Sequence, residues 1–294
     1  MVIRAPGGET RGRPRRDGDT VTRLQMDFAT LAALPDERID VLTGALLIAK
    51  DEFPSLDLCH EKARIDELAA PLGRLDELEA ADQATLLSER LFGDCGFRGN
   101  ADDYYDPRNS YMNAVLDRKL GIPITLSLLY TEVARRAGVP ASGVGFPGHF
   151  LVRIETESGE PLMIDPFGGG RVVGRGTLES LLERGPTSKR TSRALLAPAN
   201  HRTVLARMLG NLKGVYAARG ELSRLLVVTS RLLELSPDSA TDVRDRGLIA
   251  MRLGSPRVAE EDLARYLALE PEASDVAEIR RIVGRLREQT TAFN

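Results

Sequence analysis

The chain has 294 residues, of which 42% are hydrophobic and 28% charged, and its net charge at pH 7 is −3. Such a length suits two domains, and the composition is that of an ordinary globular protein. A negative chain has no overall electrostatic attraction to nucleic acid, and no apolar run reaches the ~20 residues that a bilayer requires. The N-terminus lacks the apolar segment of a secretory signal. Two cysteines and three histidines predict neither a disulfide framework nor a zinc site. We therefore expect a cytoplasmic protein with no metal, no cofactor, and no nucleic-acid or membrane partner.

The first 92 residues divide into a tail and a helical lobe. Residues 1–23 are rich in glycine, arginine and proline and predict a disordered tail. Residues 24–92 form the lobe, in which apolar residues at helical spacing predict helices near 39–49, 58–72 and 81–92. Asp36 stands where the N-cap of the first of these helices is expected.

Residues 93–190 are rich in glycine and aromatic residues and are expected to form a mixed core. Two helices are predicted near 111–120 and 123–137, followed by strands at 149–154 and 161–165. A hairpin turning near residue 158 places Leu151 opposite Asp165, with His149 at a diagonal position on the same face. Diagonal neighbours lie within ~7–8 Å, a gap that long side chains can bridge.

Residues 200–294 return to a helical pattern that repeats every 34 residues. The pairs that define this period are Gly220 and Gly254, Leu235 and Leu269, and Pro237 and Pro271. Glycine at the turn between helices and proline after the second helix are typical of tetratricopeptide (TPR) repeats, the alternative being a plain helical hairpin. Two units are fewer than the three or so that such repeats need for stability, so they are expected to pack on the preceding domain or on a helix near 276–286.

Four segments between residues 105 and 169 share a pattern with a known family. They are Tyr-Asp-Pro-Arg-Asn-Ser-Tyr at 105–111, Val-Leu-Asp-Arg-Lys-Leu-Gly-Ile-Pro-Ile-Thr-Leu-Ser at 115–127, Gly-Val-Gly-Phe-Pro-Gly-His-Phe-Leu-Val-Arg at 143–153 and Ile-Asp-Pro-Phe-Gly-Gly at 164–169. The chain resembles the SirB1-type proteins, whose core is a transglutaminase-like domain of the papain-like superfamily. The resemblance implies an α+β fold with this core in domain 24–190, comprising the helical lobe 24–92 and the core 93–190, followed by the TPR-like region 200–294.

The resemblance also implies a catalytic Cys-His-Asp triad, whose cysteine opens a helix where the thiolate is favoured. His149 and Asp165 match the histidine and the aspartate. The cysteine position falls on Pro123. Proline suits the first turn of a helix, but it has no nucleophilic atom and no backbone N–H for an oxyanion hole.

Nearby side chains offer alternative nucleophiles. Thr125 is rotated ~200° from Pro123 on the helix, and Ser127 lies ~6 Å deeper along the axis on nearly the same face, where a packing role is expected. Cys95, in a glycine-flanked loop, could approach from elsewhere, whereas Cys59 is expected to be a buried apolar side chain.

Several other residues of the matching segments are candidates for the wall of a cleft around His149. These binding candidates are Arg108, Asn109, Tyr111, Gly148 and Phe167. For Asp106, Arg108 and Asn109 we favour the alternative of a capping and ion-pair network in a turn before a helix.

The preferred interpretation is a catalytically degenerate protein that binds a peptide or protein in a cleft at His149 and Asp165, with the TPR-like region as a second interaction surface. The alternative is a cysteine- or serine-dependent acyl transferase or amide hydrolase with Cys95 or Ser127 as a relocated nucleophile. A third hypothesis makes His149, oriented by Asp165, a general base acting on water. The sequence leaves the oligomeric state open.

Overall fold

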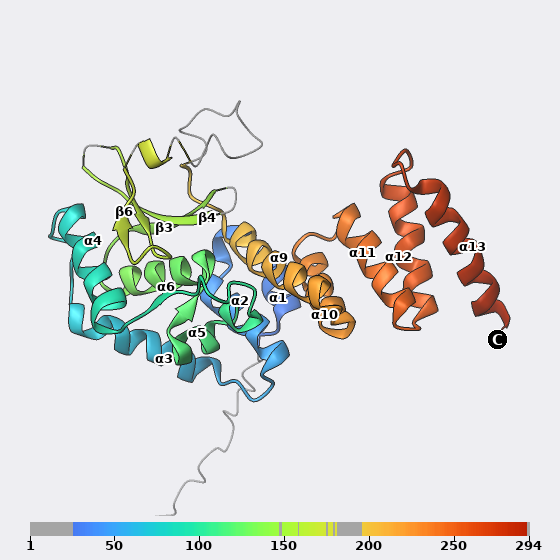
Figure 1. The fold of residues 1–294 in the computed structure, drawn as a ribbon, viewed down its shortest axis with the longest axis horizontal. Helices are drawn as coiled ribbons and strands as arrows, with labels where there is room; N and C mark the ends of the chain where they lie inside the picture. Colours follow the sequence, from blue (N-terminus) through green and yellow to red (C-terminus); the bar gives the residue numbers. More distant parts are fainter. Residues whose placement is uncertain are drawn as a thin grey trace, which may run out of the picture.

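The computed structural model describes residues 26–292, apart from residues 147, 148, 158, 175, 179 and 181–195. The tail predicted at 1–23 lies outside the described residues. Figure 1 shows a small sheet and its helices at one end of an elongated molecule and a row of helices at the other. The fold is mostly helical with a small antiparallel sheet, so the predicted α+β class is confirmed.

The described part of the N-terminal lobe contains four α-helices. They are α1 (Phe28–Ala32), α2 (Val41–Glu52), α3 (Leu58–Ala69) and α4 (Ala80–Ser88), the last continuing into a π-helical segment, Glu89–Asp94. The three predicted helices are thus present.

The predicted N-cap of the first of these helices is wrong. The cap of α2 is Asp40, whose carboxylate accepts a hydrogen bond from the Thr43 backbone N–H. Asp36 instead supports the first turn of a distant helix, α9 (His201–Arg219), whose N-cap is Asn200. The Asp36 carboxylate oxygens accept the backbone N–H groups of His201 at 3.0 Å and Arg202 at 2.8 Å.

Replacing Asp36 by alanine is expected to lower the free energy of unfolding by about 1–2 kcal/mol, the usual loss when a helix cap is removed. Two first-turn N–H groups of α9 lose their acceptor in this variant. Urea unfolding of the wild type and Asp36→Ala measures the difference. Glu37→Ala is the control: this neighbouring side chain is exposed, so its removal should leave the free energy of unfolding unchanged. Equal stability of all three proteins would contradict a capping role for Asp36.

The main sheet has four antiparallel strands in the order β3-β4-β5-β6. They are β3 (Ala141–Phe146), β4 (His149–Ile154), β5 (Leu162–Asp165) and β6 (Arg171–Val172). Val152 pairs with Ile164, so the register continued by one residue puts Leu151 opposite Asp165, as predicted. The sequence did not predict β3 or β6. A separate parallel pair, β1 (Arg98–Gly99) and β2 (Leu120–Gly121), lies before the second core helix.

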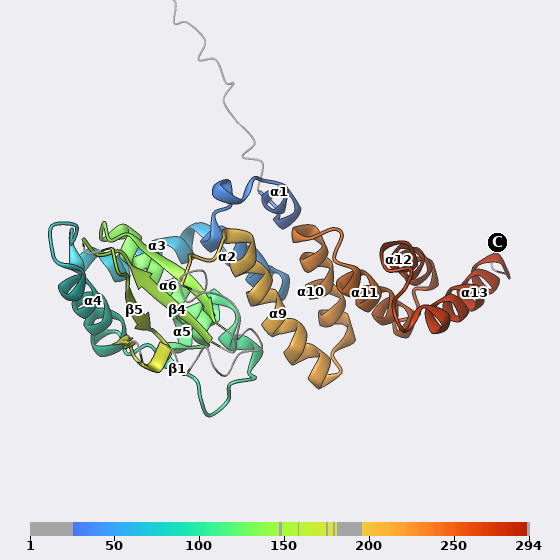
Figure 2. The ribbon, with the colours of Figure 1, turned by 90° about the horizontal axis from the view of Figure 1, so that it is seen from above.

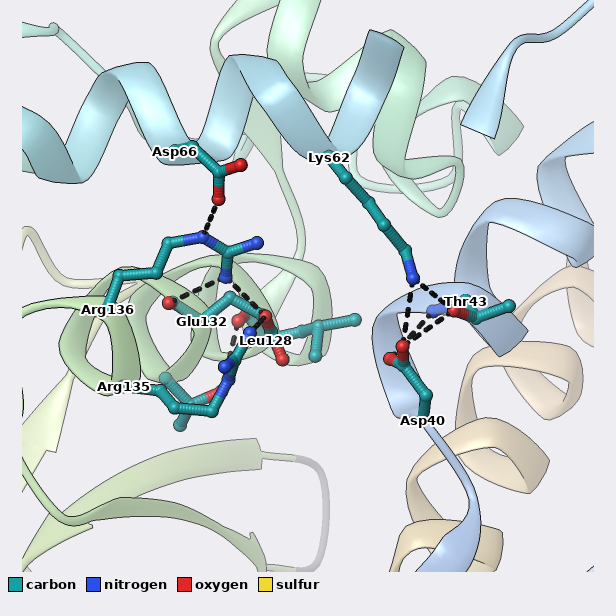
Figure 3. A network of polar contacts seen from close by, with 9 residues as sticks. Asp40, Thr43, Lys62, Asp66, Leu128, Glu132, Arg135 and Arg136 are labelled. Atoms are coloured by element: carbon teal, nitrogen blue, oxygen red, sulfur yellow. Dashed lines mark hydrogen bonds and ion pairs between the residues drawn. The ribbon is translucent and has the colours of Figure 1, made fainter. Parts of the chain in front are cut away.

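Two helices of the core were predicted and are present, α5 (Met112–Arg118) and α6 (Pro123–Arg136). Helix α6 packs against β3 and β4. Near its C-terminal end, Arg136 forms ion pairs with Glu132 on the same helix and with Asp66 on α3. Figure 3 shows the Arg136 side chain reaching from α6 to α3, so this contact fixes one end of α6 relative to the helical lobe.

The C-terminal region consists of five helices within the described residues: α9, α10 (Leu222–Leu235), α11 (Ala240–Arg252), α12 (Pro256–Leu269) and α13 (Val276–Ala292). Gly220 and Gly254 take left-handed backbone conformations at the turns between α9 and α10 and between α11 and α12, as the 34-residue period predicts. Helices α11–α13 enclose a core of their own with the end of α10, so the expected packing on a flanking helix is confirmed.

Helix α9 belongs to the main core, which confirms the expected packing of the repeats on the preceding domain. Leu205, Met208 and Leu209 of α9 are buried in one cluster with Leu42 and Leu46 of α2. The two helices touch closely at Gly44, where a β-carbon would lie 2.6 Å from the Leu205 side chain. Figures 1 and 2 show α9 beside α2 from two directions.

No helix in the described part of the chain is long and apolar enough to cross a membrane.

Candidate functional site

The structure brings His149 and Asp165 together. His149 is the first residue of β4 and Asp165 the last of β5, and the His149 Nε2 lies 3.4 Å from an oxygen of Asp165. Both side chains are mostly buried, with 19% and 18% of their surfaces exposed. Because Nε2 faces Asp165, the Nδ1 edge of the ring points away from the carboxylate. Among the described residues, Asp165 is the one side chain that forms a hydrogen bond or ion pair with the ring.

The turn after β5 supports the Asp165 carboxylate. Burial alone would raise the pKa of Asp165, but the hydrogen bond with His149 and the one from the Gly168 backbone N–H, at 3.0 Å, outweigh it. The positive charge of Arg171 acts in the same direction. The pKa of Asp165 is therefore held below its usual value of 3.8, and the group is ionised at neutral pH.

This lowered pKa makes a contribution to stability that depends on pH. In the unfolded chain the carboxyl has its usual pKa, so the folded state gains stability above that pKa and loses it as pH falls through the lower folded value. Asp165→Asn is thus expected to be less stable than the wild type at pH 7, with a smaller difference at pH 3. Urea unfolding of both proteins at the two pH values measures this; a difference independent of pH would contradict the assigned ionisation.

An arginine from the C-terminal region holds the strand ends at this site. Arg207 of α9 donates from Nη2 to the carbonyl oxygens of Phe146 at 3.0 Å and His149 at 2.9 Å. These two residues are the last described pair of the β3–β4 hairpin. The guanidinium also lies 5.0 Å from the centre of the Phe150 ring. Gly148, a predicted binding residue, lies outside the described residues.

Phe167, another predicted binding residue, connects Asp165 to the start of α6. Its ring centre is 6.0 Å from that of Tyr104, and its side chain packs on Gly99, where a β-carbon would lie 2.6 Å from it. Gly99 in β1 pairs with Gly121 in β2, two residues before Pro123. Phe167 therefore joins the end of β5 to the segment that leads into α6.

The position of Pro123 follows from how α6 lies along β4. Pro123 is the buried first residue of α6, and Ser127, one turn later, donates a hydrogen bond to the Phe150 carbonyl at 3.2 Å. The later turns of α6 line a cavity together with the start of β3, which pairs with the end of β4. Helix α6 and β4 therefore run in the same direction, and Pro123 lies toward the His149 end.

The two hydroxyls that follow Pro123 are both engaged in structural contacts. Thr125 Oγ1 accepts the Ile122 backbone N–H at 3.1 Å and donates to the Asn109 carbonyl at 2.8 Å, so it caps α6 from the third position of the helix. Ser127 is fully buried, and its hydroxyl donates to the Phe150 carbonyl. Neither oxygen is free to approach a substrate in this structure.

The cysteines lie in different surroundings. Cys95 follows the π-helical segment and is 8% exposed within the main core. No hydrogen bond joins its thiol to the imidazole of His149 in the part of the chain described here. Cys59 lies near the start of α3 and is exposed, so the prediction that it is buried is wrong.

Arg108 and Asn109 belong to a polar network in the turn before α5. The Asp106 carboxylate accepts from the Arg108 backbone N–H at 3.0 Å and pairs with the guanidinium groups of Arg108 and Arg118. Burial would raise the pKa of Asp106, but these hydrogen bonds and charges lower it overall. The fully buried Asn109 side chain bonds to Asn100 and to nearby backbone carbonyls, which leaves it no group for a ligand.

Tyr111, another of the predicted binding residues, lies in the core against α9. It is buried, and its hydroxyl lies 2.5 Å from the hydroxyl of Tyr216 on α9. A partner 105 residues away in the sequence removes Tyr111 from the surface.

Within the described residues, no group of three or more histidine, cysteine, aspartate or glutamate side chains could hold a metal ion. A cavity of about 310 Å³ lies between the later turns of α6, the start of β3 and the start of α9, lined in part by Thr131, Ser142 and Val204. Neither His149 nor Asp165 lines it.

Sequence reasoning missed Arg207 and Tyr104. Arg207 stands 58 residues after His149 in a helix of the repeat region, and no local pattern marks an arginine there as part of this site.

The chemistry that the assembled residues offer is that of an oriented imidazole with an open Nδ1 edge.

Known proteins resemble this chain along most of its length. A family model described as the transglutaminase-like superfamily matches residues 60–210, and a tetratricopeptide repeat model matches residues 212–284. A UPF0162 protein of Xylella fastidiosa is 40% identical over 85% of this chain and 91% of its own length. A UPF0162 protein of Pseudomonas aeruginosa is 31% identical over 90% of this chain and 97% of its own. F-box only protein 21 of the mouse is 42% identical over 42% of this chain, which corresponds to 20% of that protein.

Proposed function

Because the chain belongs to the transglutaminase-like superfamily and, within it, to the UPF0162 proteins, we propose that it binds a peptide or protein segment at His149 and Asp165 without covalent catalysis. The observation that carries this proposal is Pro123 at the start of α6, on the His149 end of β4. A proline offers neither a nucleophile nor a backbone N–H to an acyl group.

The burial of the alternative nucleophiles supports the same proposal. Ser127 is fully buried beneath Phe150 and Cys95 is 8% exposed, so either one would have to leave its packing to attack a substrate. A relocated nucleophile also needs hydrogen-bond contact with its base. The relocated-nucleophile enzyme is therefore the weaker alternative.

The His149 ring gives the site its binding chemistry. Its Nδ1 edge has no side-chain partner in the described residues, so it can exchange a hydrogen bond with a peptide group. The same open edge favours the second candidate, in which His149 acts as a general base on water, with Asp165 orienting the ring. The TPR-like helices α9–α13 provide a second surface for a protein partner.

A single experiment separates these proposals. The protein has three histidines, so ring NMR signals can be assigned by comparison with His149→Ala. A random octapeptide pool is added while mass spectrometry follows the peptides. We expect the His149 signals to shift and the peptide masses to stay unchanged. Cleavage or acyl transfer that His149→Ala abolishes would establish an enzyme instead, and unshifted His149 signals would reject peptide binding at this site.

A further inference from the structure

The cavity between α6, β3 and α9 is separate from the site at His149. Its volume of about 310 Å³ lies at the lower end of the range for ligand pockets. The later turns of α6 line it, whereas Pro123 is the first residue of that helix. Apolar side chains from four elements and a loop contribute to its wall: Val41, Leu128, Val139, Phe150 and Val204. The cavity therefore has room for an apolar group of a ligand.

One wall of this cavity is the free edge of β3, the first strand in the order of the described sheet. The Glu155 backbone N–H donates to the Pro140 carbonyl at 3.5 Å, so these two residues form a hydrogen-bonded pair across β3 and β4. Such pairs alternate with pairs that are not hydrogen-bonded in an antiparallel ladder. The next pair, Ala141 with Ile154, is therefore not hydrogen-bonded. Ala141 and Gly143 thus direct their N–H and C=O groups away from β4.

Most of these outward groups have no partner. The Gly143 carbonyl accepts the Ala199 backbone N–H at 2.8 Å. No described residue forms a hydrogen bond with the N–H or C=O of Ala141 or with the N–H of Gly143. Natural edge strands are usually guarded by lysine, proline or a covering segment, and unguarded ones accept another chain. Two donors and one acceptor beside the cavity match the backbone of an extended peptide.

The ionisable side chains around the cavity favour an occupant without charge. Glu132 and Arg135, which both line it, pair with each other at 3.0 Å, and Arg136 also pairs with Glu132 at 2.6 Å (Figure 3). The Nδ1 of His201, another lining residue, lies 3.0 Å from the Asp36 carbonyl oxygen. A carbonyl only accepts hydrogen bonds, so Nδ1 carries a proton and donates it there. The cavity wall therefore contains a compensated ion pair and a fixed imidazole.

We propose that an uncharged, extended segment of a partner polypeptide adds to the edge of β3 at Ala141 and Gly143 and places an apolar side chain in the cavity. Pairing with the strand edge provides affinity, and the cavity selects the side chain. This second site goes beyond the proposed function, since it uses neither His149 nor Asp165.

The test compares two pools of octapeptides made from alanine, serine, valine, leucine and isoleucine, with acetylated and amidated ends. The second pool has every backbone nitrogen methylated, so its peptides cannot pair with a strand. Ring NMR signals of His201 in the full-length protein, assigned by comparison with His201→Ala, report on the cavity. We expect them to shift with the first pool and to need at least about tenfold more of the methylated pool for half-saturation, as the loss of one or two hydrogen bonds implies.

Three variants locate the binding. Thr131→Phe fills the cavity from α6, where the threonine hydroxyl bonds to a carbonyl of its own helix. Thr85→Phe is the matched control, since Thr85 is exposed on α4 and also bonds to a carbonyl of its helix. Ala141→Pro removes the outward N–H without removing a hydrogen bond to β4. We expect Thr131→Phe and Ala141→Pro to weaken binding of the first pool at least about tenfold, with Thr85→Phe unchanged.

The outcomes distinguish this site from the one at His149. Unchanged His149 signals in the variants without peptide show that the fold is intact. Equal half-saturation by the two pools would mean that a side chain enters the cavity without strand pairing, which overturns the proposal. A His201 shift that persists in Thr131→Phe, or the absence of any shift in the wild type, also overturns it. The His149 signals in the same spectra report on the proposed function separately.

Discussion

Replacing Pro123 by cysteine is expected to create a thiol whose reactivity depends on His149. The new side chain would stand in the first turn of α6, toward the His149 end of β4. A helix N-terminus and a neighbouring imidazolium lower a cysteine pKa from about 8.5 to about 3.5–7.5. At pH 6 the fraction of thiolate then rises by one to two orders of magnitude, and alkylation by iodoacetamide should be at least about tenfold faster than that of an ordinary thiol.

The matched control is the double variant Pro123→Cys with His149→Ala, in which the imidazolium is absent and the rate should return toward that of a free thiol. Cys59, exposed in both proteins, serves as an internal reference when the alkylated sites are mapped by mass spectrometry. An introduced thiol that reacts at the same rate with and without His149 would mean that position 123 does not face the imidazole. Pro123 would then lie away from the imidazole, and its lack of a nucleophile would no longer support binding without covalent catalysis.

Replacing Asp262 by alanine is expected to favour local unfolding of helices α11–α13. Asp262 on α12 is almost fully buried and accepts two hydrogen bonds of 2.7 Å from Arg246 on α11. Removing one partner of a buried ion pair leaves the other charge without compensation. The free energy of unfolding usually falls by about 3–5 kcal/mol as a result. Because α11–α13 enclose a core separate from the main one, hydrogen exchange should accelerate in these helices and not in residues 26–210.

Asp238→Ala is the matched control for that variant. Asp238 also pairs with an arginine of α12, Arg265 at 2.9 Å, but the carboxylate is largely exposed, so its loss should change stability by less than about 1 kcal/mol. Equal exchange rates in the two variants would show that the buried pair contributes no more to the stability of α11–α13 than the exposed one. Simultaneous loss of protection along the whole chain would show that the two cores unfold as one unit.

Local patterns in the sequence predicted much of the fold and the pairing of His149 with Asp165. Period-two strands and a turn near residue 158 were enough to place Leu151 opposite Asp165, and the pairing of β4 with β5 has that register. Strand β3 was missed because Gly143 and Gly145 weaken its strand pattern. Both glycines make room for side chains from elsewhere, the Phe150 ring at 2.5 Å from a β-carbon at Gly143 and the Arg207 guanidinium at Gly145.

Three further differences between prediction and structure concern partners far away in the sequence. Asp36 has the residue type of a cap, but the helix whose first turn it supports begins at His201. Tyr111 was placed at the site by its neighbours in the sequence, whereas its hydroxyl is bonded to that of Tyr216. Arg207 was not considered at all. In each case the deciding contact is made by α9, whose position no pattern in the first 200 residues encodes.

The dependence of the main core on α9 has a consequence for how the chain is made. Leu42 and Leu46 are covered by Leu205 and its neighbours, which are synthesised about 160 residues later. At ribosomal speeds of roughly 5–20 residues per second, that face of α2 waits on the order of 10 to 30 s for its cover. During that interval the nascent chain presents an apolar helix face to its surroundings, so a holding chaperone or an interim packing of the early helices must protect it until α9 emerges.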